Sequence, residues 1–217
     1  SLFLGSALQQ VALLYTDVAN AAFFTIFYVP LVPIIIFLFK RTSIHWSVWP
    51  SVVLCLIGGY LLTNFYDATV RLGDSLVILG ALFWSTHIIF TGIIGKKYDL
   101  PLTLGAAQTL IVALFSFVIA CTYEEFIYID IMKEINSILY AGILSGGFAF
   151  VLQIYAQKNI TPAPAAIIFS LEGVFATIAA WYILNQILDI NNLLGCFFIL
   201  CGVLLSQLLP LIKKKYT

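Results

Sequence analysis

Glu172 is the residue whose position most clearly suggests chemistry, because it is a carboxylate inside the apolar run AAIIFSLEGVFATIAAW, residues 165–181. An ionised carboxylate at the centre of a bilayer costs at least about 2.5 kcal/mol. Such a group pairs with another group, faces a water-filled cavity or takes up a proton. Two interpretations are therefore open. Glu172 senses protons or substrate in a pocket, or it is hydrogen-bonded to a neighbouring helix as part of the packing.

Trp84, His87 and Thr91 follow one another at i, i+3 and i+7, which places them on one face of a helix. His87 is the only histidine within a predicted span, and histidine is the side chain that most readily exchanges a proton near neutral pH. The alternative for His87 is a neutral ring that donates one hydrogen bond between helices. Trp84 is either a pocket wall or a packing residue.

Several uncharged polar residues also stand in apolar surroundings, where exposure to lipid would leave their polar groups unsatisfied. They are Gln9, Gln10, Asn20, Gln108, Gln153 and Tyr155. Each is a candidate for the lining of a pocket, and each is also suited to interhelical hydrogen bonding. Gln9 and Gln153 are the stronger candidates because an internal repeat, described below, relates them.

The elements that position these side chains must cross a membrane. Of the 217 residues, 62% are apolar and only 9% are charged, whereas a soluble domain carries about 25% charged residues. The mean hydropathy is +1.07. A net charge of zero gives no reason to expect a nucleic-acid partner.

Known catalytic and cofactor motifs are absent from the sequence. The four cysteines lack metal-ligand spacing, and neither a Gly-x4-Gly-Lys phosphate loop nor a His-Glu-x-x-His zinc motif occurs. A serine protease built on Ser145 and His87 would lack the usual Gly-x-Ser context. We therefore expect no metal, no cofactor and no enzymatic activity.

Polar or turn-rich breaks divide the chain into eight segments long enough, or nearly long enough, to span a bilayer. The predicted spans are residues 1–15, 18–39, 46–64, 74–95, 103–122, 136–157, 163–184 and 191–210. The sequence thus predicts an all-α helical bundle in a membrane. The first span is too short to cross alone.

Basic residues are distributed unequally between the two sides of the membrane that alternating loops define. One side holds Lys40, Arg41, Lys96, Lys97, Lys158, Lys213, Lys214 and Lys215; the other holds Arg71 and Lys133. The positive-inside rule makes the first side, with the C-terminus, cytoplasmic. We expect the cytoplasmic (inner) membrane of a bacterium. Most acidic residues sort to the outer side: Asp17, Asp67, Asp74, Glu124, Glu125, Asp130, Glu134 and Asp189. Glu172 is then the only formal charge deep in a span.

An internal repeat is indicated when the chain is shifted by 144 residues. Gln9 then coincides with Gln153, Gly58 with Gly202, and Tyr28 with Glu172. The repeat unit is five helices long, and an odd number of spans inverts the second copy relative to the first. We assign residues 1–72 to the last three helices of the first copy and residues 73–217 to the whole second copy.

The repeat also predicts what is missing. The first copy should begin about 70 residues before Ser1, given a second copy that begins near Gly73. We therefore expect a ten-helix protein of which two helices and part of a third are absent here. The alternative is an eight-span protein with a short, tilted first helix.

Two further patterns concern the helices themselves. Gly142-x-x-x-Gly146, followed by Gly147, is typical of close helix approach. Pro30 and Pro33 interrupt the second predicted span, and discontinuous helices often mark the substrate site of transporters.

Two long segments resemble the EamA-like branch of the drug/metabolite transporter superfamily. They are GDSLVILGALFWSTHIIFTGIIGKK, with its mid-helix Trp84, and NITPAPAAIIFSLEGVFATIAAWYILNQILDINNLLGCFFILCGVLL. The second supplies the family's pattern at Thr161-Pro162, Ala165-Ala166, Glu172, Trp181, Gly195 and Gly202. It departs from the pattern at Gly173, where proline is usual, and at Asn185-Gln186, where Gly-Glu is usual. The resemblance implies a ten-helix 5+5 inverted-repeat fold with a central pocket.

Together these features predict a secondary transporter that works by alternating access, with proton coupling through Glu172 or His87 as one possibility. Pocket polarity favours small organic metabolites, such as amino-acid-like polar solutes, and export is the expected direction. Tyr28, Trp84, Gln9, Gln153, Tyr155 and Gln108 complete the candidate pocket. The alternatives are an intramembrane enzyme and a non-transporting receptor or scaffold. The oligomeric state is left open.

Overall fold

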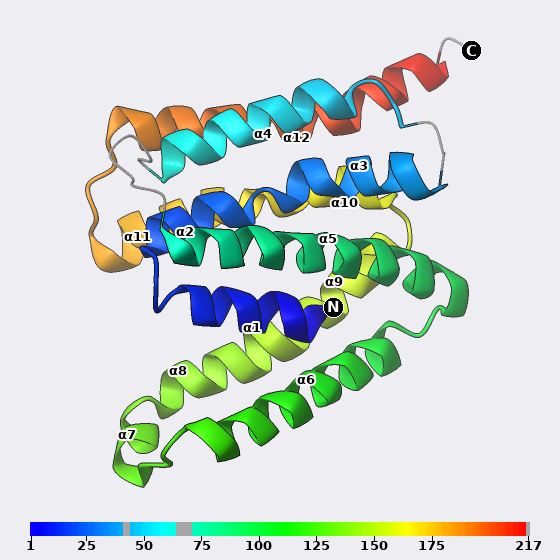
Figure 1. Cartoon of the computed structure of the whole chain (residues 1–217). Helices are drawn as coiled ribbons and strands as arrows, with labels where there is room; N and C mark the ends of the chain where they lie inside the picture. Colours follow the sequence, from blue (N-terminus) through cyan, green and yellow to red (C-terminus); the bar gives the residue numbers. More distant parts are fainter. Residues whose placement is uncertain (41–43, 64–70, 216–217) are drawn as a thin grey trace. The chain divides into compact units, whose positions relative to one another are not determined.

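The computed structural model describes residues 1–40, 44–63 and 71–215, and all regular structure in these ranges is helical (Figure 1). The chain divides into two compact units. The first consists mainly of residues 3–89 and 161–217, and the second of residues 90–160. Arg41 and Asp67, which were assigned to opposite sides of the membrane, lie outside the described residues.

The first unit contains every described helix except those between residues 90 and 160. Its elements are α1 (Leu2–Ala12), α2 (Val18–Thr25), α3 (Tyr28–Lys40), α4 (Val48–Leu62), the first part of α5 (Leu72–Tyr98), α10 (Pro162–Phe169), α11 (Leu171–Leu184) and α12 (Ile190–Lys215). α10 packs against α3, α4 and α12. Buried alanines and β-branched side chains fill the space between these helices, among them Ala166, Ile167, Val29 and Ile199.

The second unit contains the end of α5, α6 (Pro101–Tyr123), α7 (Tyr128–Lys133), α8 (Ile135–Leu139), the π-helix η2 (Tyr140–Ala149) and α9 (Phe150–Gln157). α6 packs on α9, where a Cβ at Gly105 would lie only 2.5 Å from a side-chain atom of Val151. An ion pair between Lys158 and Asp99 ties the end of α9 to the α5–α6 turn.

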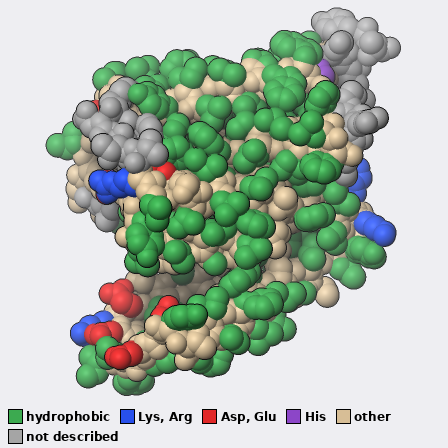
Figure 2. Space-filling view, in the orientation of Figure 1, with side chains coloured by type: hydrophobic (Ala, Val, Ile, Leu, Met, Phe, Trp, Pro, Cys, Tyr) green, Lys and Arg blue, Asp and Glu red, His purple; other side chains and the backbone are tan. Residues whose placement is uncertain are grey.

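Six segments are long and apolar enough to cross a membrane, counted among the residues that the structure describes. α1 and α4 are shorter apolar helices of 11 and 15 residues. The eight predicted spans correspond to these six segments and two short helices, and the first is indeed the shortest. Hydrophobic side chains cover most of the face seen in Figure 2. Three ion pairs among the described residues, Arg71–Asp17, Lys133–Asp130 and Lys158–Asp99, each join partners that the sequence places on one side of the membrane.

The predicted interruption at Pro30 and Pro33 is displaced in the structure. α3 runs through both prolines, and the break lies earlier, where α2 ends at Thr25 and α3 begins at Tyr28. Pro30 explains the position, because its ring crowds the carbonyl four residues before it and removes the donor to that carbonyl. That carbonyl belongs to Ile26, which instead accepts a 2.9 Å hydrogen bond from the Val29 amide.

The interpretation of Gly142 and Gly146 as a close helix contact is wrong for the described structure. A Cβ added at Gly142 would meet nothing within 4 Å, and one at Gly146 would meet only the carbonyl of Ala141 in its own helix. These glycines lie in η2 instead. Within this segment the Gly146 carbonyl accepts a 3.3 Å hydrogen bond from the Thr109 hydroxyl of α6.

Two helix breaks in the first unit have the same geometry. α2 spans 18–25 and α10 spans 162–169, so both bounds differ by 144 residues. The residue before each helix is extended: Asp17 has φ −75° and ψ 150°, and Thr161 has φ −71° and ψ 150°. The residues after them agree as closely, with φ −58° and ψ −15° at Ile26 and φ −60° and ψ −15° at Ser170.

α4 and α12 pack against each other in an antiparallel pair related by an approximate two-fold axis. A Cβ at Gly58 would lie 2.7 Å from the Gly195 carbonyl oxygen. A Cβ at Gly202 would lie 2.9 Å from the Ser51 carbonyl oxygen. Adding 144 to 58 gives 202, and adding 144 to 51 gives 195, so each contact is the image of the other. Such reciprocal contacts are characteristic of two-fold packing.

Candidate functional site

Tyr28 and Glu172 occupy equivalent places at the two helix breaks. Tyr28 is the first residue of α3, and Glu172 lies in the first turn of α11. The Tyr28 side chain is 7% exposed, whereas Glu172 is exposed. The two are close enough to interact electrostatically. Tyr28 and Glu172 thus lie within electrostatic range of each other, with the phenol buried and the Glu172 residue exposed.

Cys55 and Ser170 form the buried polar surroundings of this pair. The Ser170 hydroxyl donates a 2.6 Å hydrogen bond to the Ile167 carbonyl and lies 3.4 Å from the Cys55 sulfur. Cys55 is fully buried and also interacts electrostatically with Tyr28. Sequence reasoning missed both residues, although Ser170 stands two positions before Glu172 in the run that attracted attention.

Backbone hydrogen bonds to the i−3 carbonyl define the second break, at Ser170. At this point the Ser170 amide donates to Ile167, three residues back, and the Gly173 amide donates to Ser170 at 3.2 Å. When an amide turns to the i−3 carbonyl, the i−4 carbonyl loses its usual donor. At both breaks the i−3 bonds therefore interrupt the regular α-helical pattern, shortly before Tyr28 in one case and Glu172 in the other.

Gln9 links three helices of the first unit through one carboxamide. Its oxygen accepts a 3.2 Å hydrogen bond from the Trp84 indole on α5, and its nitrogen donates a 3.4 Å bond to the Thr25 hydroxyl at the end of α2. Thr25 in turn donates to the Ala21 carbonyl at 2.7 Å. Gln9 is thus a predicted pocket residue with both ends of its amide engaged.

Trp84 and His87 lie together on α5, as their spacing predicts. Their ring centroids are 6.0 Å apart with the rings nearly perpendicular. Trp84 is half-buried and its ring lies over Gly5, where a Cβ would be 3.3 Å from three ring atoms. His87 and Thr91 are each 4% exposed. Close packing against Gly5 and the hydrogen bond to Gln9 fix the orientation of the indole.

The remaining candidates, Gln108, Gln153 and Tyr155, belong to the second unit. Gln108 on α6 and Gln153 on α9 are half-buried. Tyr155 is 59% exposed, and the Lys158 ammonium lies 5.1 Å from the centre of its ring. This cation–π contact gives Tyr155 a place beside a charged residue at the end of α9.

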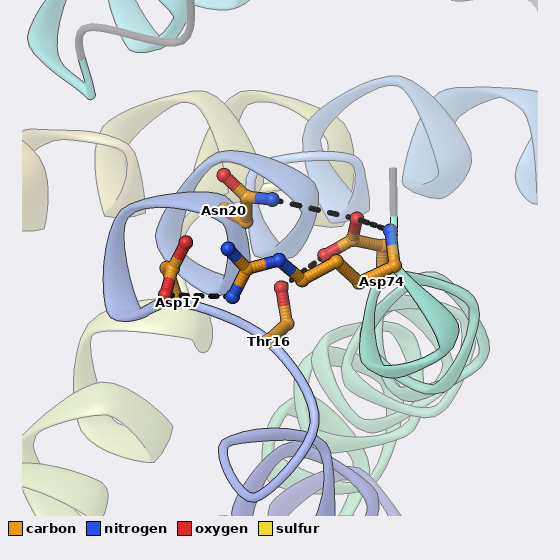
Figure 3. A network of polar contacts seen from close by, with 5 residues as sticks. Thr16, Asp17, Asn20 and Asp74 are labelled. Atoms are coloured by element: carbon orange, nitrogen blue, oxygen red, sulfur yellow. Dashed lines mark hydrogen bonds and ion pairs between the residues drawn. The ribbon is translucent and has the colours of Figure 1, made fainter. Parts of the chain in front are cut away.

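Asp74 is a polar residue whose burial the sequence did not predict. It was assigned to the outer side as one of several loop acids, yet its side chain is fully buried in the first turn of α5. It accepts hydrogen bonds from the Thr16 hydroxyl at 2.5 Å, the Arg71 amide at 2.7 Å and the Asn20 amide at 3.4 Å (Figure 3). The bond from the Arg71 amide, three residues back, has the geometry of half of a capping box, although Arg-x-x-Asp does not match the usual Ser/Thr-x-x-Glu/Gln sequence.

An ion pair borders this buried network. The Arg71 guanidinium lies 2.9 Å from Asp17, the residue before α2 (Figure 3). Both side chains are largely exposed, at 46% and 61%. The Asp74 network and the ion pair together fasten the α1–α2 turn to the N-terminus of α5.

Comparison with known proteins adds family information to this geometry. A sequence model of the EamA-like transporter family matches residues 71–208. An uncharacterized transporter of Archaeoglobus fulgidus is 30% identical over 211 residues, which are 95% of this chain and 66% of that protein. The uncharacterized transporter YoaV of Bacillus subtilis is 28% identical over 147 residues, 64% of this chain and 48% of that protein.

A plant relative and a solved structure extend the likeness. A WAT1-related protein of Arabidopsis thaliana is 28% identical over 131 residues, 57% of this chain and 33% of that protein. A solved protein structure superimposes with a TM-score of 0.84 at 16% identity, covering 96% of this chain and 73% of that one. The chain thus spans between one third and two thirds of the length of these curated relatives.

Proposed function

Because the chain belongs to the EamA-like transporter family, we propose that the protein is a secondary transporter that moves a small polar organic solute by alternating access. As an integral membrane protein with several apolar spans, it has the setting this function requires. A transporter family is not an enzyme class, and this argues against the intramembrane-enzyme alternative. The proposed orientation places the C-terminus in the cytoplasm of a bacterial cell, with export as the direction.

The observation that carries the proposal is the pair of equivalent helix breaks at Ile26 and Ser170. In secondary transporters with inverted repeats, discontinuous helices meet near the bilayer midplane and their half-helix ends form the substrate site. Here the two breaks have matching backbone angles and matching helix bounds. The reciprocal contacts of α4 and α12 support the same proposal, since an antiparallel pair related by a two-fold axis fits an inverted repeat. In this proposal residues 1–72 and 73–217 belong to different copies.

The proposed substrate site surrounds Glu172 and Tyr28. An accessible carboxylate in a span attracts a proton or the ammonium group of an amino-acid-like solute, because desolvation makes the bare charge unfavourable. Backbone carbonyls at the breaks offer further acceptors for N–H donors. The half-buried Trp84, oriented by Gln9, supplies an apolar surface for the rest of the solute. Proton coupling through Glu172, with His87 as a second proton carrier, belongs to this proposal.

Counterflow in reconstituted vesicles tests the function. The purified protein is placed in liposomes preloaded with a mixture of unlabelled L-amino acids, and uptake of the same amino acids in radiolabelled form is followed one by one. An internal pH-sensitive dye records proton movement in the same vesicles. Saturable counterflow of at least one amino acid, with proton flux that depends on Glu172, is the expected result.

The controls separate transport from the alternatives. Vesicles with the Glu172→Gln variant should retain folded protein and lose the proton flux. A chemically changed amino acid in the vesicles would identify an enzyme instead. Binding of an amino acid without flux would identify a receptor or scaffold, and either result would overturn the proposal.

A further inference from the structure

Several hydrogen bonds and one ion pair of the first unit join α1, α2 and the first part of α5; we call them the polar ties. The Asp74 network and the Asp17–Arg71 pair join the α1–α2 turn to the start of α5 at one end. Further along the same helices, Gln9 joins α1 to Trp84 on α5 and to Thr25 on α2. Two separate sets of hydrogen bonds thus hold α1, α2 and the first part of α5 together.

The backbones of α1 and the first part of α5 also lie close together. A Cβ at Gly73 would lie 2.6 Å from the Ala12 carbonyl oxygen and 2.9 Å from the Thr16 amide nitrogen, whereas one at Gly80 would make an ordinary contact, 3.4 Å from the Gly5 carbonyl oxygen. Glycines at such crossings let two helices touch along their backbones, which leaves little freedom for sliding. The buried charge of Asp74 adds rigidity, because each donor that moved away would leave an unpaired charge in a dry site.

The break at Ile26 lies immediately beyond these ties. The last tie to α2 is at Thr25, the final residue of that helix. On the far side, a Cβ at Gly59 of α4 would lie 2.4 Å from the end of the Ile26 side chain. Ile26 therefore stands between α1–α2–α5 and α4, which is itself clamped to α12 through Gly58, Gly195 and Gly202.

We propose that Asp74 and Gln9 are positioning residues that bind α1, α2 and the first part of α5 (residues 72–89) into one rigid body, and that this body swings about Ile26 relative to the α4–α12 pair. The body carries Trp84, His87 and Thr25, while Tyr28 lies beyond the pivot. A swing would change the spacing between the indole surface and Tyr28 without changing the spacing within the body. This movement serves the transporter proposed above, but its detection does not depend on knowing the substrate.

Spin-label distance measurements test the proposal without any substrate. Cys55, Cys121, Cys196 and Cys201 are first replaced by serine or alanine. One label pair lies within the body, at the exposed residues Leu4 and Leu72; the other connects the body to α4, at Leu72 and Val53. Distances are measured in lipid nanodiscs with Glu172 intact and in the Glu172→Gln background.

The expected result is one narrow, unchanged distance for the pair within the body. For the pair that reaches α4 we expect two distances whose proportions differ between the two backgrounds. In a further variant, Gln9→Ala combined with Asp74→Asn should broaden the Leu4–Leu72 distribution. Gln207→Ala, which removes another half-buried glutamine, one that bonds to its neighbour Ser206 in α12, should leave that distribution unchanged.

A disulfide cross-link provides the second test. A Cβ at Gly80 would lie 3.6 Å from the Leu8 Cβ, within the usual range of about 3.5–4.5 Å for a disulfide. Oxidised Leu8→Cys/Gly80→Cys protein should keep counterflow within about twofold of its reduced form, because this cross-link joins α1 and α5 within the rigid body, whose internal spacing does not change during turnover.

Either readout can overturn the inference. A shift of the Leu4–Leu72 distance between backgrounds, or loss of counterflow on forming the 8–80 disulfide, would mean that α1 and α5 move apart. A single invariant Leu72–Val53 distance would mean that the body does not swing. Failure of transport alone, with both distance results as expected, would count against the proposed function and leave the rigid body standing.

Discussion

Gly195→Ala is the substitution whose cost follows most directly from the packing of α4 and α12. The new methyl carbon would lie 2.7 Å from the Gly58 carbonyl oxygen and 2.9 Å from the Leu62 amide nitrogen. Both are backbone atoms, so relief requires the two helices to move apart rather than one side chain to turn. Overpacking of this kind costs about 1–3 kcal/mol.

Part of that cost is offset by the higher helix propensity of alanine, about 0.8–1 kcal/mol relative to glycine. Gly80→Ala in α5 is the matched control, because its Cβ would make only ordinary contacts, the nearest 3.4 Å from the Gly5 carbonyl oxygen. The same propensity gain applies to both variants. The difference between them therefore isolates overpacking, and we expect Gly195→Ala to be less stable than Gly80→Ala by about 1–3 kcal/mol.

Thermal unfolding in one detergent, followed by size-exclusion chromatography of the heated samples, measures the difference. For a chain of this length it corresponds to a midpoint lower by roughly 2–12 °C in Gly195→Ala than in Gly80→Ala. Equal midpoints, or a lower midpoint for Gly80→Ala, would refute the argument that α4 and α12 meet along their backbones at Gly195.

Two predictions concern the charged residues. Glu172→Gln should fold normally and flatten the pH dependence of counterflow, because the amide cannot exchange the proton that the carboxylate takes up; unchanged transport at every pH would reduce Glu172 to a packing residue. Asp74→Asn should lower the free energy of unfolding by about 1–3 kcal/mol, because a buried acceptor of three hydrogen bonds loses its charge. Asp17→Asn, at the exposed ion pair, should change the free energy of unfolding by less than about 1 kcal/mol. A larger effect at Asp17 than at Asp74 would contradict the conclusion that the Asp74 network holds the α1–α2 turn to α5.

The spans were predictable from sequence because lipid imposes a length and a polarity that each segment must satisfy alone. The eight predicted segments all correspond to helices, and the pairing of Tyr28 with Glu172 followed from the repeat. The burial of Asp74, in contrast, was not predictable from the sequence. Its burial depends on the α1–α2 turn folding over it from more than fifty residues away, and composition carries no trace of such a contact.

Glycine patterns show the same limit. Gly142-x-x-x-Gly146 has the spacing of a helix contact, yet close contacts occur at Gly58, Gly195 and Gly202. The sequence singled out Gly58 and Gly202 only as matching positions of a repeat, and Gly195 and Gly202 only as part of a family pattern. Spacing tells which glycines share a helix face. It does not tell which face meets another helix, and that choice depends on the whole arrangement of the bundle.

The helix breaks lead to a last prediction, because a proline follows the first break by four residues, at Pro30, whereas the equivalent position after the second break is Val174. Pro30 corresponds to Val174 under the shift of 144 residues, and the carbonyl that a proline at 174 would crowd belongs to Ser170, the residue at the second break. That carbonyl already accepts the Gly173 amide, three residues on, as the Ile26 carbonyl accepts Val29.

Val174→Pro should therefore be tolerated at a cost of less than about 1.5 kcal/mol, since the break it demands is already present and the two side chains are similar in size. Ile178→Pro, one turn further into α11 at an exposed position, should cost about 3 kcal/mol or more because an unbroken turn must open. Thermal unfolding of the two variants side by side decides the matter. Equal losses of stability in the two variants would mean that the break at Ser170 is not equivalent to the break at Ile26. The proposed transporter site would then lose its strongest support, the pair of equivalent breaks.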